Sequence, residues 1–196
     1  MDNKNQKTDL FFQHLNAVNK DIKKQIHVIE HGNGVIICHS LNFSKEDECL
    51  LRNAAEISGY RHCNFLYTIM AVAYGMELDV VDIPEGNLIV NIERDFYEMA
   101  VVALGGIVCS VGNSPEDESI ANNILRLLEK TPPQLAADIN KNGICMAGHN
   151  IRFKNTENKI TRITRLPVHV NNEPDAITRG VHRILEKKHD SLLFIV

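Results

Sequence analysis

The sequence predicts an α+β fold in which helices pack on a mainly antiparallel sheet built from hairpins. Three observations predict it: paired β-branched runs joined by Gly, Pro or Asn turns, helical stretches between them, and a hydrophobic content of 44% in 196 residues. The expected hairpins cover about residues 26–39, 78–92 and 144–166. Because hairpins alternating with helices leave no parallel crossovers, we expect antiparallel pairing. The length predicts a single domain, residues 1–196.

An amphipathic helix is expected first, over about residues 7–24. Its apolar residues share one stripe, and lysines crowd its last turn, where the helix dipole favours cations. The first hairpin follows, because the β-branched runs 26–30 and 35–39 flank a turn that contains Gly32 and Asn33.

Two further segments, Phe65–Gly75 and Phe96–Cys109, contain few polar residues and predict helices that are buried on nearly every face. Before them, Ser44 is expected to cap a helix with three acidic residues in its first turn, and Gly59 to end it. The second hairpin lies between the two apolar segments and turns at Pro84–Asn87.

The last third of the chain contains the third hairpin and two helices beside it. A helix is expected from about Ser114 to Pro132, and another over residues 174–188. The terminal segment 192–196 is wholly apolar and predicts a strand that must be covered by its own sheet or by another chain.

Composition predicts a cytoplasmic protein. The five cysteines are an odd number without a Cys-x-x-Cys pair, which is typical of reduced thiols. The N-terminus lacks the apolar segment of a signal peptide, and the longest apolar run, residues 99–111, has 13 residues where a membrane span needs about 20.

Charge is distributed unevenly along the chain. Residues 1–140 carry 11 Lys and Arg against 20 Asp and Glu, a net of −9, whereas residues 141–196 carry 10 against 5, a net of +5. This pattern indicates either charge matching inside one fold or a docking face for an acidic partner.

Catalysis by a cysteine is the first enzymatic hypothesis, because Cys38-His39 and His62-Cys63 are adjacent. Neighbouring side chains point to opposite faces of a strand and diverge on a helix, so neither pair forms a thiolate–imidazolium couple locally. We therefore expect no catalytic residue among them.

Metal binding is the second hypothesis, because the chain has nine histidines. His27 and His31, and Cys145 and His149, lie four residues apart, but in strands and turns and without a third ligand at metal-site spacing. The sequence therefore predicts no metal and no cofactor.

A basic patch is the third candidate site. In the expected third hairpin, alternation places cations on one strand face, which suits a polyanion or an acidic helix. The acidic overall charge and the lack of neighbouring aromatic platforms argue against nucleic acid, and the sequence has no Gly-rich or Walker-type phosphate loop. The patch comprises Arg152, Lys154, Lys159, Arg162 and Arg165.

Partner binding is the hypothesis that positive features favour. Two apolar helices and an apolar terminal strand exceed what one small core needs, which indicates a partner or a homo-oligomer. The expected partner-binding residues are Tyr67, Met70, Tyr74, Leu192, Phe194 and Val196.

One stretch resembles a known family. An apolar helix closing on Tyr74-Gly75, a hairpin through Asp82–Gly86 and a following apolar helix resemble the small acidic adaptor proteins of type IVB (Dot/Icm) secretion systems, of the IcmS and LvgA kind. The resemblance covers about a quarter of the chain and rests on element order.

The resemblance implies a cytoplasmic, non-enzymatic adaptor or chaperone. Such a virulence-associated subunit binds other small adaptors and the C-terminal tail of a coupling ATPase, and helps recruit effector proteins. The alternative is a small homo-oligomeric α+β enzyme with a His/Cys site at a subunit interface, built for example from Cys145, His149 and His169.

Overall fold

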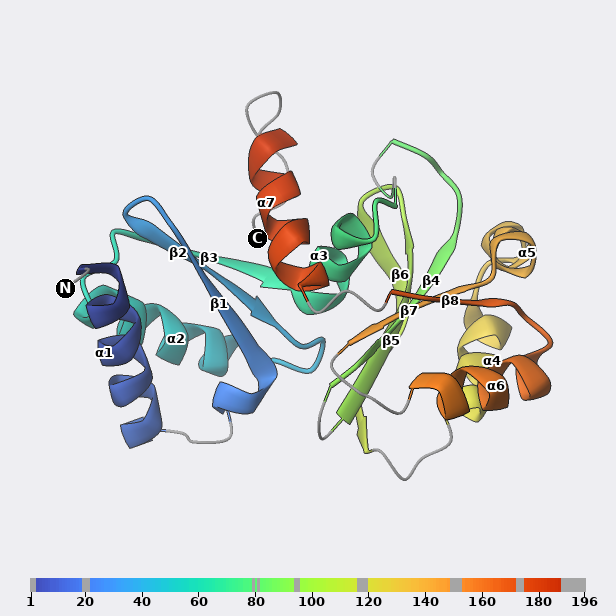
Figure 1. The fold of residues 1–196 in the computed structure, drawn as a ribbon, viewed down its shortest axis with the longest axis horizontal. Helices are drawn as coiled ribbons and strands as arrows, with labels where there is room; N and C mark the ends of the chain where they lie inside the picture. The colour runs from blue at the N-terminus through green and yellow to red at the C-terminus, as the bar shows by residue number, and fades with distance from the viewer. Residues whose placement is uncertain are drawn as a thin grey trace. The chain divides into compact units, whose positions relative to one another are not determined.

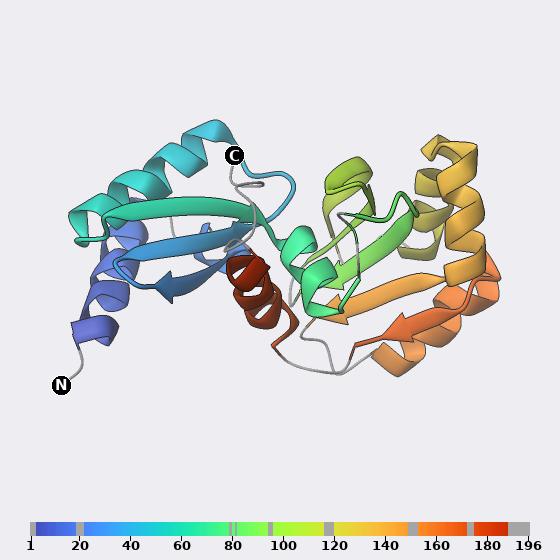
Figure 2. The same ribbon diagram turned by 90° about the horizontal axis from the view of Figure 1, so that it is seen from above.

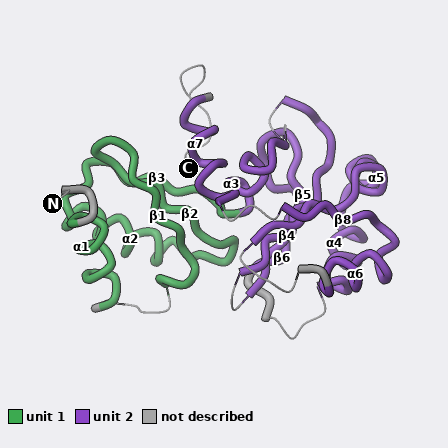
Figure 3. Tube along the Cα trace, in the orientation of Figure 1, with its two compact units in different colours: residues 1–68, 190–196 green, residues 69–189 purple. Residues whose placement is uncertain are grey.

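The chain forms two compact units in the computed structural model, residues 1–68 with 190–196, and residues 69–189 (Figure 3). Each unit contains its own sheet and its own hydrophobic core. The residues that the structure describes are 3–18, 22–78, 80, 82–93, 96–115, 120–148, 153–171 and 175–187.

Unit 1 is a three-stranded sheet in the order β1-β2-β3, with helices packed on one face (Figure 1). Phe11 and Leu15 of the first helix and Leu51 of the second pack against Ile37 and Phe65 of the sheet. The elements are α1 (Asn3–Val18), the short 3-10 helix η1 (Ile22–Gln25), β1 (Ile26–His31), β2 (Gly34–His39), α2 (Lys45–Ile57) and β3 (His62–Tyr67).

The first predicted hairpin is confirmed. Strands β1 and β2 pair antiparallel from Ile26↔His39 to His31↔Gly34, around a turn in which Gly32 has φ +58°. The predicted cap of α2 is also confirmed. The Ser44 hydroxyl accepts a hydrogen bond from the Asp47 amide, and the Asp47 carboxylate accepts one from the Ser44 amide.

A partly buried polar cluster joins α1 to the rest of unit 1. The Glu30 carboxylate accepts hydrogen bonds from the hydroxyls of Thr8 and Tyr60, and Lys7 donates to the Gly59 carbonyl at 3.0 Å. Burial and the neighbouring Glu30 raise the pKa of Tyr60 to about 12. The phenol therefore stays protonated and keeps donating to Glu30 at neutral pH.

Unit 2 is a five-stranded sheet in the order β6-β5-β4-β7-β8 with helices on both faces (Figures 1 and 2). Its strands are β4 (Asn87–Ile92), β5 (Phe96–Ala103), β6 (Gly106–Pro115), β7 (Ile144–Gly148) and β8 (Val168–Val170). Its helices are α3 (Thr68–Gly75), α4 (Ile120–Lys130), α5 (Pro133–Asn142), α6 (Phe153–Thr164) and α7 (Ala176–Lys187).

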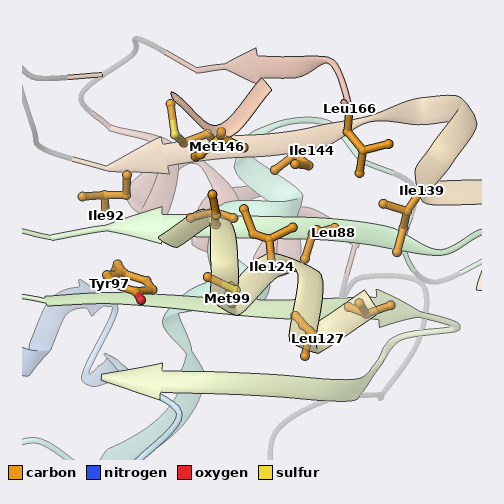
Figure 4. Close-up of a cluster of buried hydrophobic side chains, with 14 residues drawn as sticks. Leu88, Ile92, Tyr97, Met99, Ile124, Leu127, Ile139, Ile144, Met146 and Leu166 are labelled. Atoms are coloured by element: carbon orange, nitrogen blue, oxygen red, sulfur yellow. The ribbon is translucent and has the colours of Figure 1, made fainter. Parts of the chain in front are cut away.

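One face of this sheet carries the larger core (Figure 4). Leu88, Met99 and Met146 of the strands pack against Ile124 of α4 and Ile139 of α5, and all five side chains are buried. These apolar residues recur at every second strand position, so alternation places them on one face. The apolar stripe of the amphipathic helix α4 covers this face of the sheet.

Helices α3 and α7 lie on the opposite side of the sheet from α4 and α6 (Figures 1 and 2). They approach so closely that a Cβ at Gly180 would overlap the backbone of Ala71, and one at Gly75 would overlap that of Ala176. Arg183 of α7 donates to the Tyr74 carbonyl at 2.9 Å and pairs with Glu77. Small residues therefore set the distance between the two helices.

The two predicted apolar helices are wrong in whole or in part. Residues 96–109 form β5 and the start of β6, and residues 65–75 form the end of β3 followed by the short α3. A continuous apolar run suits a buried strand as well as a buried helix, because neither has a solvent face to create periodicity. The β-branched residues of the second run favour the strand.

The second and third predicted hairpins are also wrong. Residues 78–92 contain one strand, β4, and residues 144–166 contain β7 followed by helix α6. The expected mainly antiparallel sheet is therefore wrong as well. Among the described strands, three pairs are antiparallel (β1–β2, β4–β5, β5–β6) and three are parallel (β2–β3, β4–β7, β7–β8).

Replacing Gly180 by alanine should destabilise the protein by about 3 kcal/mol, because the added methyl meets backbone atoms that cannot rotate away. The control is Gly106→Ala, where the nearest atom lies at an ordinary 3.9 Å, and its effect should stay within about 0.5 kcal/mol. Urea unfolding of both variants measures the difference. Equal midpoints would contradict the close α3–α7 packing.

Candidate functional site

Polar side chains gather where two central strands of unit 2 end. Strands β4 and β7 are parallel neighbours, and their last residues, Ile92 and Gly148, are register partners. In the sheet order β6-β5-β4-β7-β8, the strand that follows β4 in the sequence, β5, lies on one side of this pair, and the strand that follows β7, β8, lies on the other. Ligands of open sheets bind outside the carboxyl ends of the strands at such a reversal of strand order. We call this edge the β4/β7 edge.

Two buried polar residues lie inside the apolar strands next to this edge. Asn91 of β4 and Glu98 of β5 are register partners, and both side chains are fully buried. The Asn91 amide nitrogen donates to the Glu93 carboxylate at 3.1 Å, while its Oδ1 atom has no hydrogen-bond partner among the described residues. Asn91 and Glu98 therefore place an amide and a carboxyl group beneath this edge, and Glu93 places a carboxylate at it.

The β4–β5 turn closes tightly at this edge. The Glu93 amide donates to the Phe96 carbonyl at 2.9 Å, which leaves only Arg94 and Asp95 between them in the sequence. At the end of β7, Gly148 has φ +133°, and a Cβ there would overlap the Ile92 carbonyl. Glycine is therefore needed at this position so that the two strands can approach.

The parallel strands of unit 1 end in a cluster of aromatic rings. His39, the last residue of β2, is 3% exposed, and its ring centroid lies 5.1 Å from those of Phe43 and Tyr67 and 5.9 Å from that of Phe65. His39 donates from Nδ1 to the Ser40 carbonyl at 3.0 Å, since a carbonyl can only accept.

Burial lowers the pKa of His39, and the Ser40 hydrogen bond and the Glu48 carboxylate, whose Oε1 lies 3.9 Å from Nε2, offset that effect only in part. His39 is therefore a neutral, structural imidazole at neutral pH.

Residues that sequence reasoning missed are Asn91, Glu93, Glu98 and Gly148. A signal for Asn91 and Glu98 was present in the sequence, because each is a lone polar residue inside an apolar run.

The cysteine and histidine pairs that the sequence singled out form no catalytic couple. Burial raises the pKa of Cys38 to about 12 and that of Cys63 to about 11, so both remain thiols at neutral pH. Cys145 and His169 are register partners on β7 and β8, but His169 hydrogen-bonds the Asn142 carbonyl at 3.0 Å, and burial raises the Cys145 pKa to about 11. His149 lies outside the described residues.

The metal hypothesis gains no support from the geometry. Within the described ranges, no three or more His, Cys, Asp and Glu side chains come together as a metal site would require. His27 and His31 lie near the start and at the end of β1, and the extended strand keeps their side chains apart.

The predicted basic patch lies only partly within the described residues. Lys159 and Arg162 are exposed on helix α6, and Arg165 follows that helix with φ +62°. Arg152 and the side chain of Lys154 lie outside the described residues. The expected strand face with alternating cations is thus replaced by a helix surface.

The predicted partner-binding residues differ in exposure. Tyr67 is 40% exposed, whereas Met70 and Tyr74 of α3 are buried. Leu192, Phe194 and Val196 lie outside the described residues. The parts of the chain that the structure describes include no helix long and apolar enough to cross a membrane.

A second candidate surface is the free side of β6, the side of this end strand of the unit 2 sheet that pairs with no other described strand. Its residues 106–114 include no charged side chain, and Val108 is 42% exposed. Leu104, at the hairpin that leads into it, is 63% exposed. An uncharged edge strand of this length is a ready template for pairing with another strand.

Comparisons with known proteins now bear on this geometry. The model of the MreB/Mbl protein family matches residues 113–192. The cell shape-determining protein MreB of Escherichia coli K12 is 21% identical over an alignment of 226 positions, which covers 78% of this chain and 65% of MreB. MreB of Salmonella typhimurium matches to the same extent. The chain thus spans slightly less than two thirds of the length of these relatives.

Solved structures match over 77% to 91% of the chain. MreB5 of Spiroplasma citri bound to AMPPNP has a TM-score of 0.72 at 17% identity, covering 91% of this chain and 74% of MreB5. The chain has the actin-like fold of MreB. The same MreB5 bound to ADP gives a TM-score of 0.68 at 16% identity, covering 78% of this chain and 69% of that one. The MamK double helical filament gives 0.58 at 14%, covering 77% and 68%.

The MreB-like fold overturns the resemblance to secretion adaptors. The order of elements around Tyr74-Gly75 that suggested a type IVB adaptor belongs to β3, α3 and β4 of an actin-like fold. The adaptor function and the expected partners, namely other adaptors, a coupling ATPase and effectors, are therefore wrong. The alternative of an interfacial His/Cys enzyme is not supported either.

His39 should make the stability of the protein depend on pH. Because its folded-state pKa is lowered, it binds a proton more readily in the unfolded chain, so stability is lost as pH falls below about 6.5. His39→Gln should remove the contribution of His39 to this loss. Because one proton is involved, that contribution is at most about 1.4 kcal/mol of unfolding free energy per pH unit. Urea unfolding at pH 7 and pH 5 measures it, with the same substitution at the exposed His31 as control. Equal pH dependence in wild type and His39→Gln would contradict the assignment.

Proposed function

We propose that this chain is an MreB-like cytoskeletal protein that assembles with copies of itself in the cytoplasm. The observation that carries the proposal is the match of the MreB/Mbl family model to residues 113–192, the segment that forms α4 to α7 of unit 2. The actin-like fold over 91% of the chain supports it. One solved relative with this fold is a double helical filament, and two structures of another hold ADP and AMPPNP.

The free side of β6 is the surface proposed for contact between copies. When a strand pairs antiparallel with the same strand of a second copy, a charged residue lies opposite or close to the same charged residue of that copy. The two like charges then repel each other. Residues 106–114 carry no charge and avoid this cost. The exposed Val108 and Leu104 add apolar surface beside the strand.

Such pairing is isologous and joins two copies only. A filament additionally requires a heterologous contact that repeats from copy to copy. The β6 contact is therefore proposed to join two strands of subunits laterally. The exposed cations of α6 and the exposed Tyr67 remain candidates for the repeating contact.

Assembly is tested by sedimentation and electron microscopy of the purified chain over a range of concentrations. We expect a critical concentration above which the chain pellets and filaments are visible. A chain that stays monomeric at all concentrations in several salts would contradict the proposed function. A chain that pellets only as amorphous material would contradict it equally.

Val108→Lys should weaken the lateral contact. Lysine on an edge strand opposes pairing because its charge is desolvated and faces the same charge on the second copy. We expect at least about a tenfold increase in the dissociation constant of the dimer, measured by analytical ultracentrifugation.

The matched control is Leu125→Lys, which introduces the same charge at an apolar residue of α4 that is 37% exposed. This variant should dimerise like the wild type. If both variants weaken association equally, general charge repulsion and not the β6 edge is responsible.

A further inference from the structure

The actin-like fold implies a nucleotide, because the solved MreB5 structures hold ADP and AMPPNP. We propose that this chain departs from that property: its β4/β7 edge does not accept a nucleotide polyphosphate, and its assembly proceeds without one. The part about assembly rests on the function proposed above. The part about binding rests on the residues of the edge alone.

The residues of the β4–β5 turn do not match those of a phosphate-binding turn. Phosphate-binding turns present free backbone N–H groups and use glycine so that the backbone approaches the anion closely. Here the Glu93 amide already donates to the Phe96 carbonyl at 2.9 Å. The four residues from Glu93 to Phe96 include no glycine, so each carries a side chain at the turn.

The charge at the same turn has the wrong sign. Glu93 is held at the end of β4 by the Asn91 amide, which donates to its carboxylate at 3.1 Å. In the sequence, Glu93 is followed by one basic residue, Arg94, and by a second acidic residue, Asp95, so residues 93–95 carry a net negative charge. Glu98 brings a further carboxyl group next to Asn91 beneath the edge. A polyphosphate would meet oxygen atoms where it needs N–H donors and cations.

The one glycine that ends a strand at this edge is already used for packing. Gly148 lets β7 approach β4, since a Cβ there would overlap the carbonyl and amide of Ile92. Its small size therefore serves the contact between two strands. It does not open space for a ligand.

Unit 1 also lacks a free phosphate cradle where its parallel strands end. Helix α2 follows β2, and a helix N-terminus is the general site for an anion. Its first turn already holds Glu46, Asp47 and Glu48, and the Ser44 capping box uses the end amides. The protein's own carboxylates thus occupy the position that a phosphate would take.

The binding experiment uses the full chain below its assembly concentration. Isothermal titration calorimetry and thermal unfolding are recorded with MgATP and MgADP, with Spiroplasma citri MreB5 as the positive control. We expect no saturable heat and a change in Tm of less than about 1 °C at 100-fold the concentration that saturates the control. At 100 times Kd a ligand raises the folded-to-unfolded ratio about 100-fold, so real binding would be plain. Saturable binding with Kd below about 0.1 mM, displaced by ADP, would overturn the proposal.

The assembly experiment separates this inference from the proposed function. Pelleting is compared after apyrase treatment, with ATP and with AMPPNP, and the pelleted fraction should be the same in all three. Assembly that requires ATP would overturn the inference while leaving the cytoskeletal function intact. No assembly under any condition would overturn the function, whereas the calorimetric result on the monomer would still decide whether the edge binds nucleotide.

Discussion

The parallel pairing of β4 with β7 is the constraint on which unit 2 depends. It joins segments more than 50 residues apart in the sequence, and it places β8, α6 and α7 by fixing where β7 lies. The pairing requires Gly148, because no other residue lets the two backbones meet at Ile92. The same pairing creates the edge at which an actin-like protein would be expected to present a ligand, so the architecture of the sheet and the chemistry of its edge are set together.

Much of the local structure follows from the sequence, whereas the topology does not. The hairpin over residues 26–39 and the Ser44 cap were predictable because turn chemistry and capping act between near neighbours. The runs at Phe65–Gly75 and Phe96–Cys109 were not, because full burial removes the periodicity that separates helix from strand. Parallel pairs such as β2–β3 depend on contacts across a helix, which no local pattern encodes. The candidate site was missed for the same reason, although Asn91 and Glu98 stood out as polar residues in apolar runs.

A fold shared with nucleotide-binding filament proteins does not by itself assign nucleotide binding to this chain, because the fold fixes where a ligand would lie and side chains decide whether it binds. At the β4/β7 edge, the Asn91 amide nitrogen donates to the Glu93 carboxylate, so a carboxylate of the protein itself is held where a phosphate would approach. A filament subunit of this kind would be controlled by its concentration and its partners, since no hydrolysis step would mark older subunits.

The separation of β4 from β7 along the chain also bears on how the protein reaches its native state. Pairing of the consecutive strands β4, β5 and β6 closes short loops and is favoured early, whereas pairing of β7 with β4 closes a longer loop that contains α4 and α5 and is therefore expected later. During that interval β4 is a bare edge rich in Leu, Ile and Val. The nascent sheet is thus transiently open at β4, and the competition between β7 and a foreign strand for β4 is a kinetic hazard that the finished structure no longer reveals.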